Sequence, residues 1–350
     1  MPARGRNKGS RSRFGECAPA FCVALVGASL CRCQSPGTPP PQATSNATIK
    51  MDVNEGEISC VAEDSHTGPV HGLTSNDFAI RVDNLPVSLR ALGTDSNVPI
   101  HISLLIDVSL SQKGMERVHA EALRGLNAEL HSGRDFVNIY TFGSAVRLFK
   151  DWQDVGTLNV ASLEHIDSKS GKMLKKNPFY RIGGTRLFDA VSDAIDNDKG
   201  IAGRKAILIL SDGVDEGSDI DSGAALKEAE RGDVSISALE FAPSEPTFIS
   251  PGFLSTKIHD SLAAISKASG GVFLHAVRGQ ESQQVQVIIR LLKEEYILYF
   301  PLPQISPGPH RISIALTKPA NGTSLRFRQR VWISSSDPGS QHSPAQTMPK

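Results

Sequence analysis

Three short segments, far apart in the sequence, carry hydroxyl and carboxylate side chains of the kind that bind a metal ion. They are Asp107-Val108-Ser109-Leu110-Ser111, Gly183-Gly184-Thr185 and Ser211-Asp212-Gly213. In an extended segment, residues at i, i+2 and i+4 point the same way, so Asp107, Ser109 and Ser111 can present three oxygens to one point. Neutral hydroxyls with few carboxylates suit Mg²⁺, which takes few protein ligands and keeps several waters.

This set resembles the metal-ion-dependent adhesion site of von Willebrand factor A domains, in which Asp-x-Ser-x-Ser is followed by a Thr and then by an Asp. The five positions are filled in that order by Asp107, Ser109, Ser111, Thr185 and Asp212. The resemblance implies a bound Mg²⁺ or Mn²⁺ with an exchangeable position for a carboxylate of a protein partner. An Asx-type turn capping a helix that begins near Lys113 is the alternative for the first segment, but it leaves Thr185 and Asp212 without a role.

Alternating strand and helix patterns surround these segments and predict an α/β domain over residues 98–277. The apolar runs 100–106 and 206–210 are typical of strands that are buried on both faces. Helical patterns lie at 115–130, 187–195, 224–229 and 262–268. The order predicts a doubly wound, mostly parallel sheet. Asp107 and Asp212 each follow an apolar strand, at the edge where open α/β sheets bind ligands.

Small β units are predicted on both sides of this domain. In residues 49–96, the segments 78–82 and 85–92 are expected to form a hairpin across Asp83-Asn84. In residues 283–333, a helix at 283–293 precedes the strands 296–302, 311–316 and 325–333, of which the last two are expected to form a second hairpin. A unit of about 45 residues buries too little surface to be very stable alone, so these units are expected to pack on the α/β domain and to pair beneath it.

The arrangement as a whole resembles the von Willebrand factor A-related proteins first grouped from acidobacteria. Gly72-Leu73-Thr74 with Asp77-Phe78 matches the signature GLT..DF, and Tyr296-Ile297-Leu298-Tyr299 corresponds to the aromatic-rich C-terminal strand of that family. The resemblance covers about residues 48–333. It implies an exported protein but assigns no ligand.

Residues 1–33 are predicted to be an export signal. Six of their seven charged residues are basic, and a 13-residue apolar run, Ala18 to Leu30, follows the basic stretch. Spanning a bilayer takes about 20 apolar residues, so this length is typical of a signal-peptide core. We therefore expect an extracytoplasmic protein, whether secreted, periplasmic or surface-attached. Membrane contact is expected only through an uncleaved leader or a lipid anchor on Cys31.

Composition narrows the remaining possibilities. Residues 34–48 are rich in Pro, Ser and Thr and are predicted to be a linker, and residues 334–350 are predicted to be a disordered tail. Beyond the leader the chain is mildly acidic, so no nucleic-acid partner is expected. Cys60 is the one cysteine beyond residue 33, which excludes an internal disulfide and a cysteine zinc site there and predicts a small buried side chain.

The leading hypothesis is an exported, metal-dependent protein-binding or adhesion module rather than an enzyme. The sequence contains no Gly-x-Ser-x-Gly, His-Glu-x-x-His or phosphate-binding Gly-Lys-Ser/Thr motif. The alternatives are a metal-dependent enzyme and an accessory subunit of an ATPase or metal-insertase complex, and the leader disfavours the latter. Structural roles are expected for Arg231-Gly232-Asp233, between a helix and a strand, and for Asp189 in a first helical turn. Asp215 and Glu216 are expected on a solvated rim.

Overall fold

The computed structural model describes residues 55–64, 68–94, 98–112, 114–158, 184–241, 256–302, 306–318 and 322–333. The predicted leader, linker and C-terminal tail lie outside these ranges. Six described strands build the central sheet of an α/β layer. In spatial order they are β11 (Phe273–His275), β10 (Val234–Glu240), β9 (Arg204–Ser211), β6 (Ile100–Asp107), β7 (Phe136–Phe142) and β8 (Arg147–Asp154).

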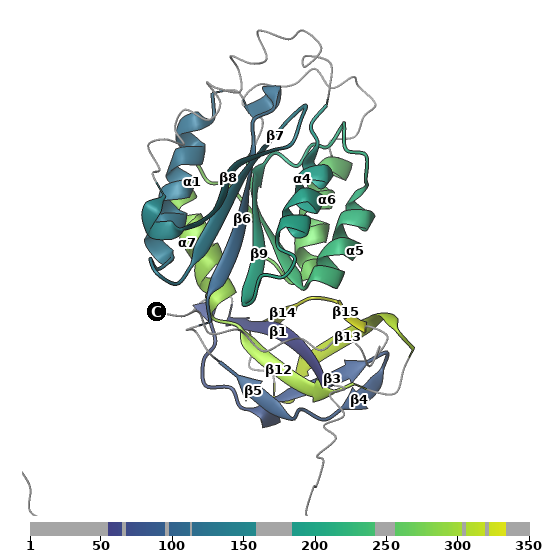
Figure 1. The fold of residues 1–350 in the computed structure, drawn as a ribbon. Coiled ribbons are helices and arrows are strands. Elements are labelled where there is room, and N and C mark those ends of the chain that lie inside the picture. The colour runs from purple at the N-terminus through teal and green to yellow at the C-terminus, as the bar shows by residue number, and fades with distance from the viewer. Residues whose placement is uncertain are drawn as a thin grey trace, which may run out of the picture. The chain divides into compact units, whose positions relative to one another are not determined.

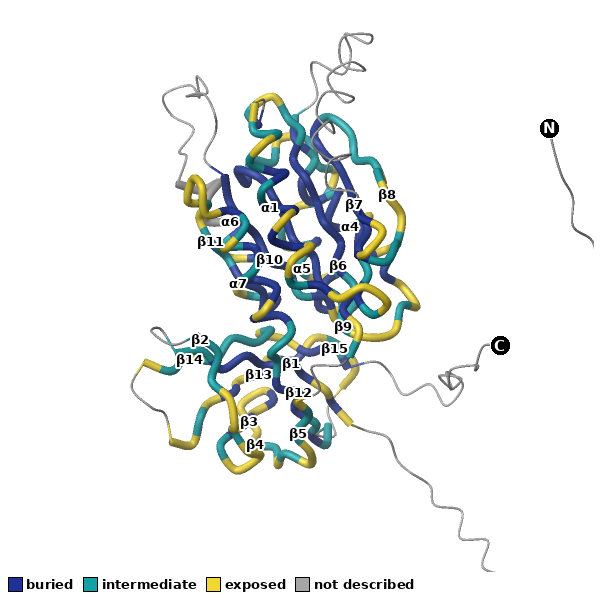
Figure 2. The backbone as a smooth tube through the Cα atoms, turned by 90° about the vertical axis from the view of Figure 1, so that its left-hand side faces the viewer, coloured by how far each residue is buried: buried dark blue, intermediate teal, exposed yellow. Residues whose placement is uncertain are grey.

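The central sheet is mixed. Five of its strands run parallel, and β8 pairs antiparallel with β7. The predicted α/β fold is therefore confirmed. The prediction of a mostly parallel sheet is confirmed in part. It holds for the central sheet, whereas the strands outside this layer are antiparallel. β6 and β9 are buried along most of their length, as expected of strands covered on both faces (Figure 2).

Helices cover both faces of this sheet (Figure 1). On one face lie α1 (Glu116–Glu129) and α7 (Glu281–Lys293), and on the other lie α4 (Leu187–Asn197), α5 (Ser222–Gly232) and α6 (Thr256–Ser269). Three described 3₁₀ turns span Ser75–Asp77, Leu110–Gln112 and Val155–Thr157. None of the described helices is long and apolar enough to cross a membrane.

The α/β layer extends further than the sequence pattern indicates. The helix at 283–293 was expected to belong to the C-terminal β unit. Instead α7 buries Val285, Ile288 and Leu292 in the same core cluster as Leu123 and Leu126 of α1. The layer therefore ends at Lys293, because the apolar face of α7 is satisfied by the central sheet.

The order in which successive strands are added to the sheet reverses in its middle. From β6 the chain passes through α1 to β7 on one side, whereas from β9 it passes through α5 to β10 on the other side. The two crossover helices consequently lie on opposite faces. β6 and β9 are neighbours, so their carboxyl ends meet at the topological switch point, where open α/β sheets bind their ligands.

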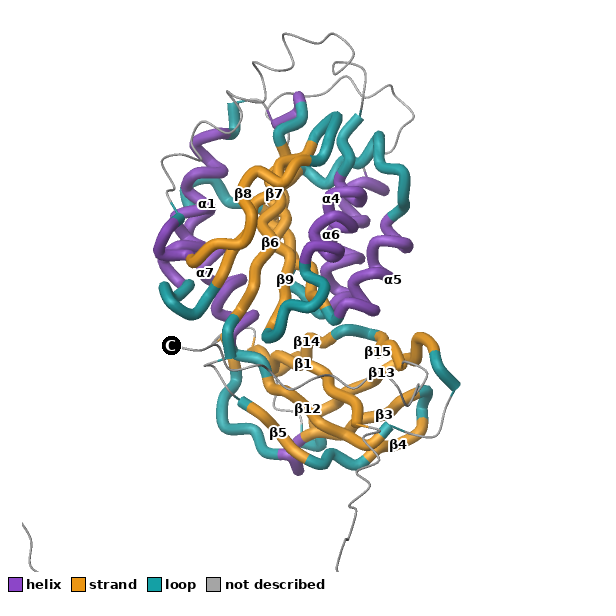
Figure 3. The backbone as a smooth tube through the Cα atoms, viewed as in Figure 1, coloured by secondary structure: helices purple, strands orange, loops and turns teal. Residues whose placement is uncertain are grey.

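The nine other described strands form two antiparallel sheets that combine segments from both ends of the described chain (Figure 3). One sheet holds β14 (Thr323–Phe327), β1 (Glu55–Asp64), β12 (Tyr296–Pro301), β5 (Ala91–Gly93) and β2 (Gly68–Pro69), and the other holds β15 (Arg330–Ile333), β13 (Gly308–Leu316), β3 (Phe78–Val82) and β4 (Leu85–Val87). They share one core, in which Cys60 is a buried free thiol. The expected pairing of the two flanking units is present.

The two predicted hairpins are only partly present. Asp83 and Asn84 have positive φ angles of 47° and 70°, which suit the tight turn between β3 and β4. Residues 91–93, however, pair with β12 in the other sheet. Likewise β15 pairs with β13, whereas β14 pairs with β1. Alternating apolar residues do not reveal a change of sheet, because the period of two is the same in both.

Candidate metal centre

Two buried carboxylates lie at the switch point of the central sheet. Asp107 is the last residue of β6 and Asp212 directly follows β9, and their exposed fractions are 0% and 1%. Ile106, the residue before Asp107, and Leu210, two residues before Asp212, are register partners in the parallel pair. The structure therefore brings both predicted carboxylates to neighbouring strand ends.

Both carboxylate oxygens of Asp107 accept hydrogen bonds, one from a hydroxyl and one from a backbone amide. Ser211 Oγ donates to Oδ2 at 2.6 Å, and Ser109 N donates to Oδ1 at 2.8 Å. The second contact is the Asx-type hydrogen bond of the alternative interpretation, but it does not cap α1, which begins at Glu116 without a side-chain cap. Burial and then the charge of Asp212 raise the pKa of Asp107 to about 7, although the hydrogen bonds lower it.

Asp212 is held by a glutamine that sequence analysis did not single out. Gln112 Nε2 donates to Oδ2 at 3.0 Å, and Val214 N donates to Oδ1 at 3.1 Å. Gln112 is 1% exposed, and its Oε1 is buried without a hydrogen-bond partner. A buried acceptor in this position needs a donor, which a water molecule on a bound cation would supply. The one local signal was its place directly after Asp-x-Ser-x-Ser.

The two serines of the first segment lie side by side. Their Oγ atoms, of Ser109 and Ser111, are 3.0 Å apart. Neighbouring oxygens in an octahedral Mg²⁺ shell, each about 2.1 Å from the ion, are separated by about 3.0 Å. The pair therefore suits two adjacent coordination positions. Leu110 between them is 74% exposed and lies on the outer rim of the site.

Thr185 joins the same group of loops. It is 6% exposed, and its carbonyl oxygen accepts hydrogen bonds from the N–H groups of Glu216 and Gly217, both at 3.0 Å. The N–H of the following residue donates to Gly143 O at 2.9 Å. A side chain at Gly143 would meet Ser109 N at 3.4 Å, so this glycine lies against the serine loop. The segment of Thr185 is thus held between the loops that follow β7 and β9, and the first of these lies against the serine loop.

These donors fit a small, hard divalent cation. They are two carboxylates and three hydroxyls, from Asp107, Asp212, Ser109, Ser111 and Thr185. Within the described ranges, no group of three or more His, Cys, Asp or Glu side chains could hold a metal. A cation here would be held by an oxygen set that is rich in hydroxyls, which suits a hard divalent cation. It would also offset the repulsion between two buried like charges. Gly183 of the second segment lies outside the described residues.

The loop after Asp212 contains a residue whose predicted role was wrong. Asp215 was expected on a solvated rim, yet its Oδ1 accepts a hydrogen bond from Leu187 N at 2.8 Å and another from Ser218 Oγ. Its neighbour Glu216 is exposed, as expected. Asp215 contacts a helix start that lies 28 positions earlier in the chain, so no local pattern signals this contact.

The Arg231-Gly232-Asp233 tripeptide lies at the opposite edge of the central sheet, before β10. The guanidinium of Arg231 stacks over the Trp332 ring at 4.3 Å, and Asp233 forms an ion pair with Arg328. Asp233 has a positive φ of 54° and ends α5. The tripeptide therefore secures the end of a helix against the β sheets, in agreement with its predicted structural role.

No protein-family model matches the sequence, and no curated protein matches it. Similar solved structures include a von Willebrand factor type A protein from Catenulispora acidiphila, with 13% identity and a TM-score of 0.43, covering 76% of each chain. Proximal thread matrix protein 1 from the mussel byssus, with a zinc-occupied MIDAS motif, has 14% identity and a TM-score of 0.41 over 60% of this chain and 49% of that chain.

A third similar structure is an aerotolerance-related membrane protein from Bacteroides fragilis. It has 15% identity and a TM-score of 0.38, over 55% of this chain and 98% of that chain. Identities and TM-scores in this range transfer neither a metal nor an activity.

Proposed function

We propose that this protein is an extracytoplasmic binding module that uses Mg²⁺ or Mn²⁺ to capture a carboxylate of a protein partner. The observation that carries the proposal is the meeting of two buried carboxylates, Asp107 and Asp212, at the switch point of the sheet. Three hydroxyl residues lie in the same group of loops. The resemblance of the five residues to the metal-ion-dependent adhesion site of von Willebrand factor A domains supports this mode of binding.

Each residue has a distinct part in this proposal. Ser109, Ser111 and Thr185 would hold the cation through neutral hydroxyls, while Asp107 and Asp212 supply negative charge. When bound, the cation offers a positive centre with an exchangeable position. Two carboxylates leave part of the coordination shell to water, so a carboxylate from a partner has a place to bind through a charge-assisted contact.

A binding role is proposed in preference to catalysis. The partners of Asp107 and Asp212 are a hydroxyl, an amide and backbone N–H groups, which hold the carboxylates in place. An activated nucleophile would instead need an adjacent base. The enzyme and the ATPase or metal-insertase subunit remain alternatives without an observation in their favour. Export is proposed from the leader sequence, and the absence of a nucleic-acid partner from the mildly acidic composition.

Calorimetry and melting curves test the metal site. One equivalent of Mg²⁺ is expected to bind wild type, and a concentration 100 times the Kd stabilises the fold by about 2.7 kcal/mol. Asp107→Ala is expected to bind none, because it removes half of the negative charge. Equal Mg²⁺ binding by the two proteins would contradict the assignment.

Partner binding is tested with Thr185→Ala, in Mg²⁺ and in EDTA. The variant is expected to capture less partner from an envelope fraction while its melting temperature changes little, because the change removes one hydroxyl and leaves the backbone hydrogen bonds of residue 185 to Glu216 and Gly217 in place. Capture that is the same for Thr185→Ala, EDTA-treated wild type and Mg²⁺-loaded wild type would place recognition elsewhere. Cell fractionation with N-terminal sequencing tests export, and full-length protein in the cytosol would refute it.

A further inference from the structure

The helix that begins beside Thr185 is capped by a different loop. α4 begins at Leu187, and the residue at its N-cap position makes no side-chain capping hydrogen bond. Instead, Asp215 Oδ1 accepts from Leu187 N at 2.8 Å, and Ser218 Oγ accepts from Phe188 N at 3.0 Å and from Asp189 N at 3.1 Å. The N–H groups that a helix start leaves without partners are thus satisfied by the loop that follows β9.

The same loop holds the segment before the helix. Thr185 O accepts two N–H groups from it, and Asp189 Oδ1 accepts Asp219 N at 2.9 Å. Gly184 lies so close to Glu216 that a side chain there would overlap it. Hydrogen bonds therefore join the segment 184–189 to the loop 215–219 along their facing length.

We infer that Asp215 is a positioning residue for the metal centre, which fixes Thr185 to the loop of Asp212 so that both meet the cation as one unit. Thr185 lies one position before the N-cap residue, Arg186, which provides no side-chain cap. Because Asp215 and Ser218 cap α4 instead, the helix start does not draw on the nearby Thr185 hydroxyl. The inference rests on the proposed function, since the position of Thr185 matters there through metal affinity.

α5 provides a matched control. Its own N-cap residue, Asp221, accepts a hydrogen bond from Ala224 N at 2.8 Å. Asp215→Ala and Asp221→Ala each remove one carboxylate that caps a helix in the same part of the molecule. Both are expected to lower the melting temperature by about 2–4 °C. A merely structural role for Asp215 would therefore leave the two variants alike.

The decisive measurement is Mg²⁺ titration by calorimetry into the full chain and its variants. Asp215→Ala is expected to lose at least about tenfold in affinity, as is typical when a group that orients a metal ligand is removed. Asp221→Ala is expected to stay within about twofold of wild type. Asp215→Asn keeps an oxygen for Leu187 N, so it is expected to recover most of the affinity.

Amide hydrogen exchange gives a second readout, and the effect of Asp215→Ala on it can be measured without metal. In Asp215→Ala, protection is expected to fall at Leu187 and Phe188 and also at Glu216 and Gly217, whose N–H groups bond to Thr185. In wild type, Mg²⁺ is expected to slow exchange at Leu187 and Phe188.

The outcomes separate the two proposals. Equal Mg²⁺ affinity in Asp215→Ala and Asp221→Ala, with wild type binding normally, would overturn the positioning role and leave the metal site intact. A loss of protection confined to Leu187 and Phe188 would likewise show that the helix and Thr185 are not held as one unit. Wild type that binds no Mg²⁺ would overturn the proposed function, and the positioning role with it.

Discussion

Two aspartates at opposite ends of β6 are equally buried but differ in their surroundings. Asp107 ends the strand, whereas Asp135 precedes β7 and accepts the N–H of Ile100, the first residue of β6, at 3.4 Å. Both side chains are fully buried. Burial raises the pKa of both carboxyls. At Asp107 the charge of Asp212 adds to this effect and the pKa is about 7, whereas at Asp135 hydrogen bonds and nearby cations outweigh burial and lower the pKa to about 2.

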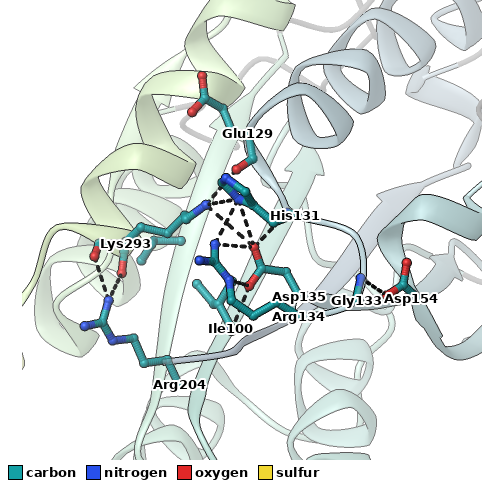
Figure 4. A network of polar contacts seen from close by, with 10 residues as sticks. Ile100, Glu129, His131, Gly133, Arg134, Asp135, Asp154, Arg204 and Lys293 are labelled. Carbon is teal, nitrogen blue, oxygen red and sulfur yellow. Dashed lines mark hydrogen bonds and ion pairs between the residues drawn. The ribbon is translucent and has the colours of Figure 1, made fainter. Parts of the chain in front are cut away.

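Figure 4 shows what surrounds Asp135. Arg134 donates from Nε and Nη2 at 2.8 and 3.0 Å, and His131 N donates at 2.8 Å. Lys293 Nζ lies 3.6 Å away and also donates to Glu129 O at 2.7 Å. The carboxylate therefore joins the end of α1 to the end of α7.

Compensation of charge, rather than burial, distinguishes the two edges of the sheet. A buried carboxylate surrounded by its own cations and N–H groups completes a structural network. A buried carboxylate beside a second one has its charge only partly offset, so a bound cation would stabilise it. The contrast supports the proposal that ligands bind at the Asp107 edge, while the Asp135 edge holds the fold together.

The largest expected effect is the loss of stability in Asp135→Ala. Removal of this carboxylate leaves Arg134 and Lys293 without its negative charge and two N–H groups without their acceptor, at a cost of about 3–5 kcal/mol. Denaturant unfolding is expected to show this loss, while the folded variant binds Mg²⁺ as wild type does. A loss below about 1 kcal/mol would contradict the assignment of Asp135 to a structural, charge-compensated network.

The same variant gives a pH prediction. A carboxyl with a lowered pKa contributes stability that is present above its unfolded value and disappears as the pH falls through its folded value, here about 2. The difference in unfolding free energy between wild type and Asp135→Ala is therefore expected to shrink as the pH falls from about 4 to about 2. A difference that stays constant over this range would contradict the assigned charge state.

The opposite behaviour is expected of Asp107→Asn. Mg²⁺ affinity falls at least about 100-fold, because the change removes half of the charge at the centre. In EDTA the melting temperature is expected to stay equal or rise, because the repulsion with Asp212 disappears. Asp135→Asn, the matched change at the other edge, is expected to lower the melting temperature. Equal destabilisation of both variants in EDTA would show that compensation does not distinguish the edges.

A smaller effect is expected of Gln112→Met. Methionine fills a similar volume but provides neither the donor to Asp212 nor the buried acceptor, so Mg²⁺ affinity is expected to fall about tenfold. Gln286→Met makes the same chemical change on α7, away from the site, and serves as the control. Calorimetry that finds equal affinities for the two variants would remove Gln112 from the centre.

The smallest effect is expected of Asp233→Gly. Asp233 lies at the same edge as Asp135 and pairs with Arg328, but it is 62% exposed. Exposed ion pairs contribute about 0–1 kcal/mol, and glycine accepts the positive φ of this position. Thermal unfolding is expected to change little, and partner capture not at all. A loss of stability as large as that of Asp135→Ala would show that position at this edge, rather than burial, determines how much an aspartate contributes to stability.

Local periodicity predicted most elements of the α/β layer. The helix expected at 115–130 spans Glu116–Glu129, and the strand expected at 100–106 spans Ile100–Asp107. Apolar spacing specifies such elements because each must bury one face or both. Membership of a sheet was harder to predict, since β5 and β14 leave their expected hairpins for strands that lie far away in the sequence.

The sequence by itself determined the alternation of strands and helices, the carboxylates at two strand ends and the spacing of Asp107, Ser109 and Ser111. These features depend on neighbours in the chain. The tertiary structure decided that β6 and β9 adjoin at the switch point, that Gln112 holds Asp212 and that Asp215 caps α4. It also decided which buried aspartate has its charge compensated. Hydrogen bonds and charge interactions act through space, and several of the partners lie far apart in the sequence, from 28 positions for Leu187 with Asp215 to 158 positions for Asp135 with Lys293. Arg134, in contrast, adjoins Asp135 in the chain.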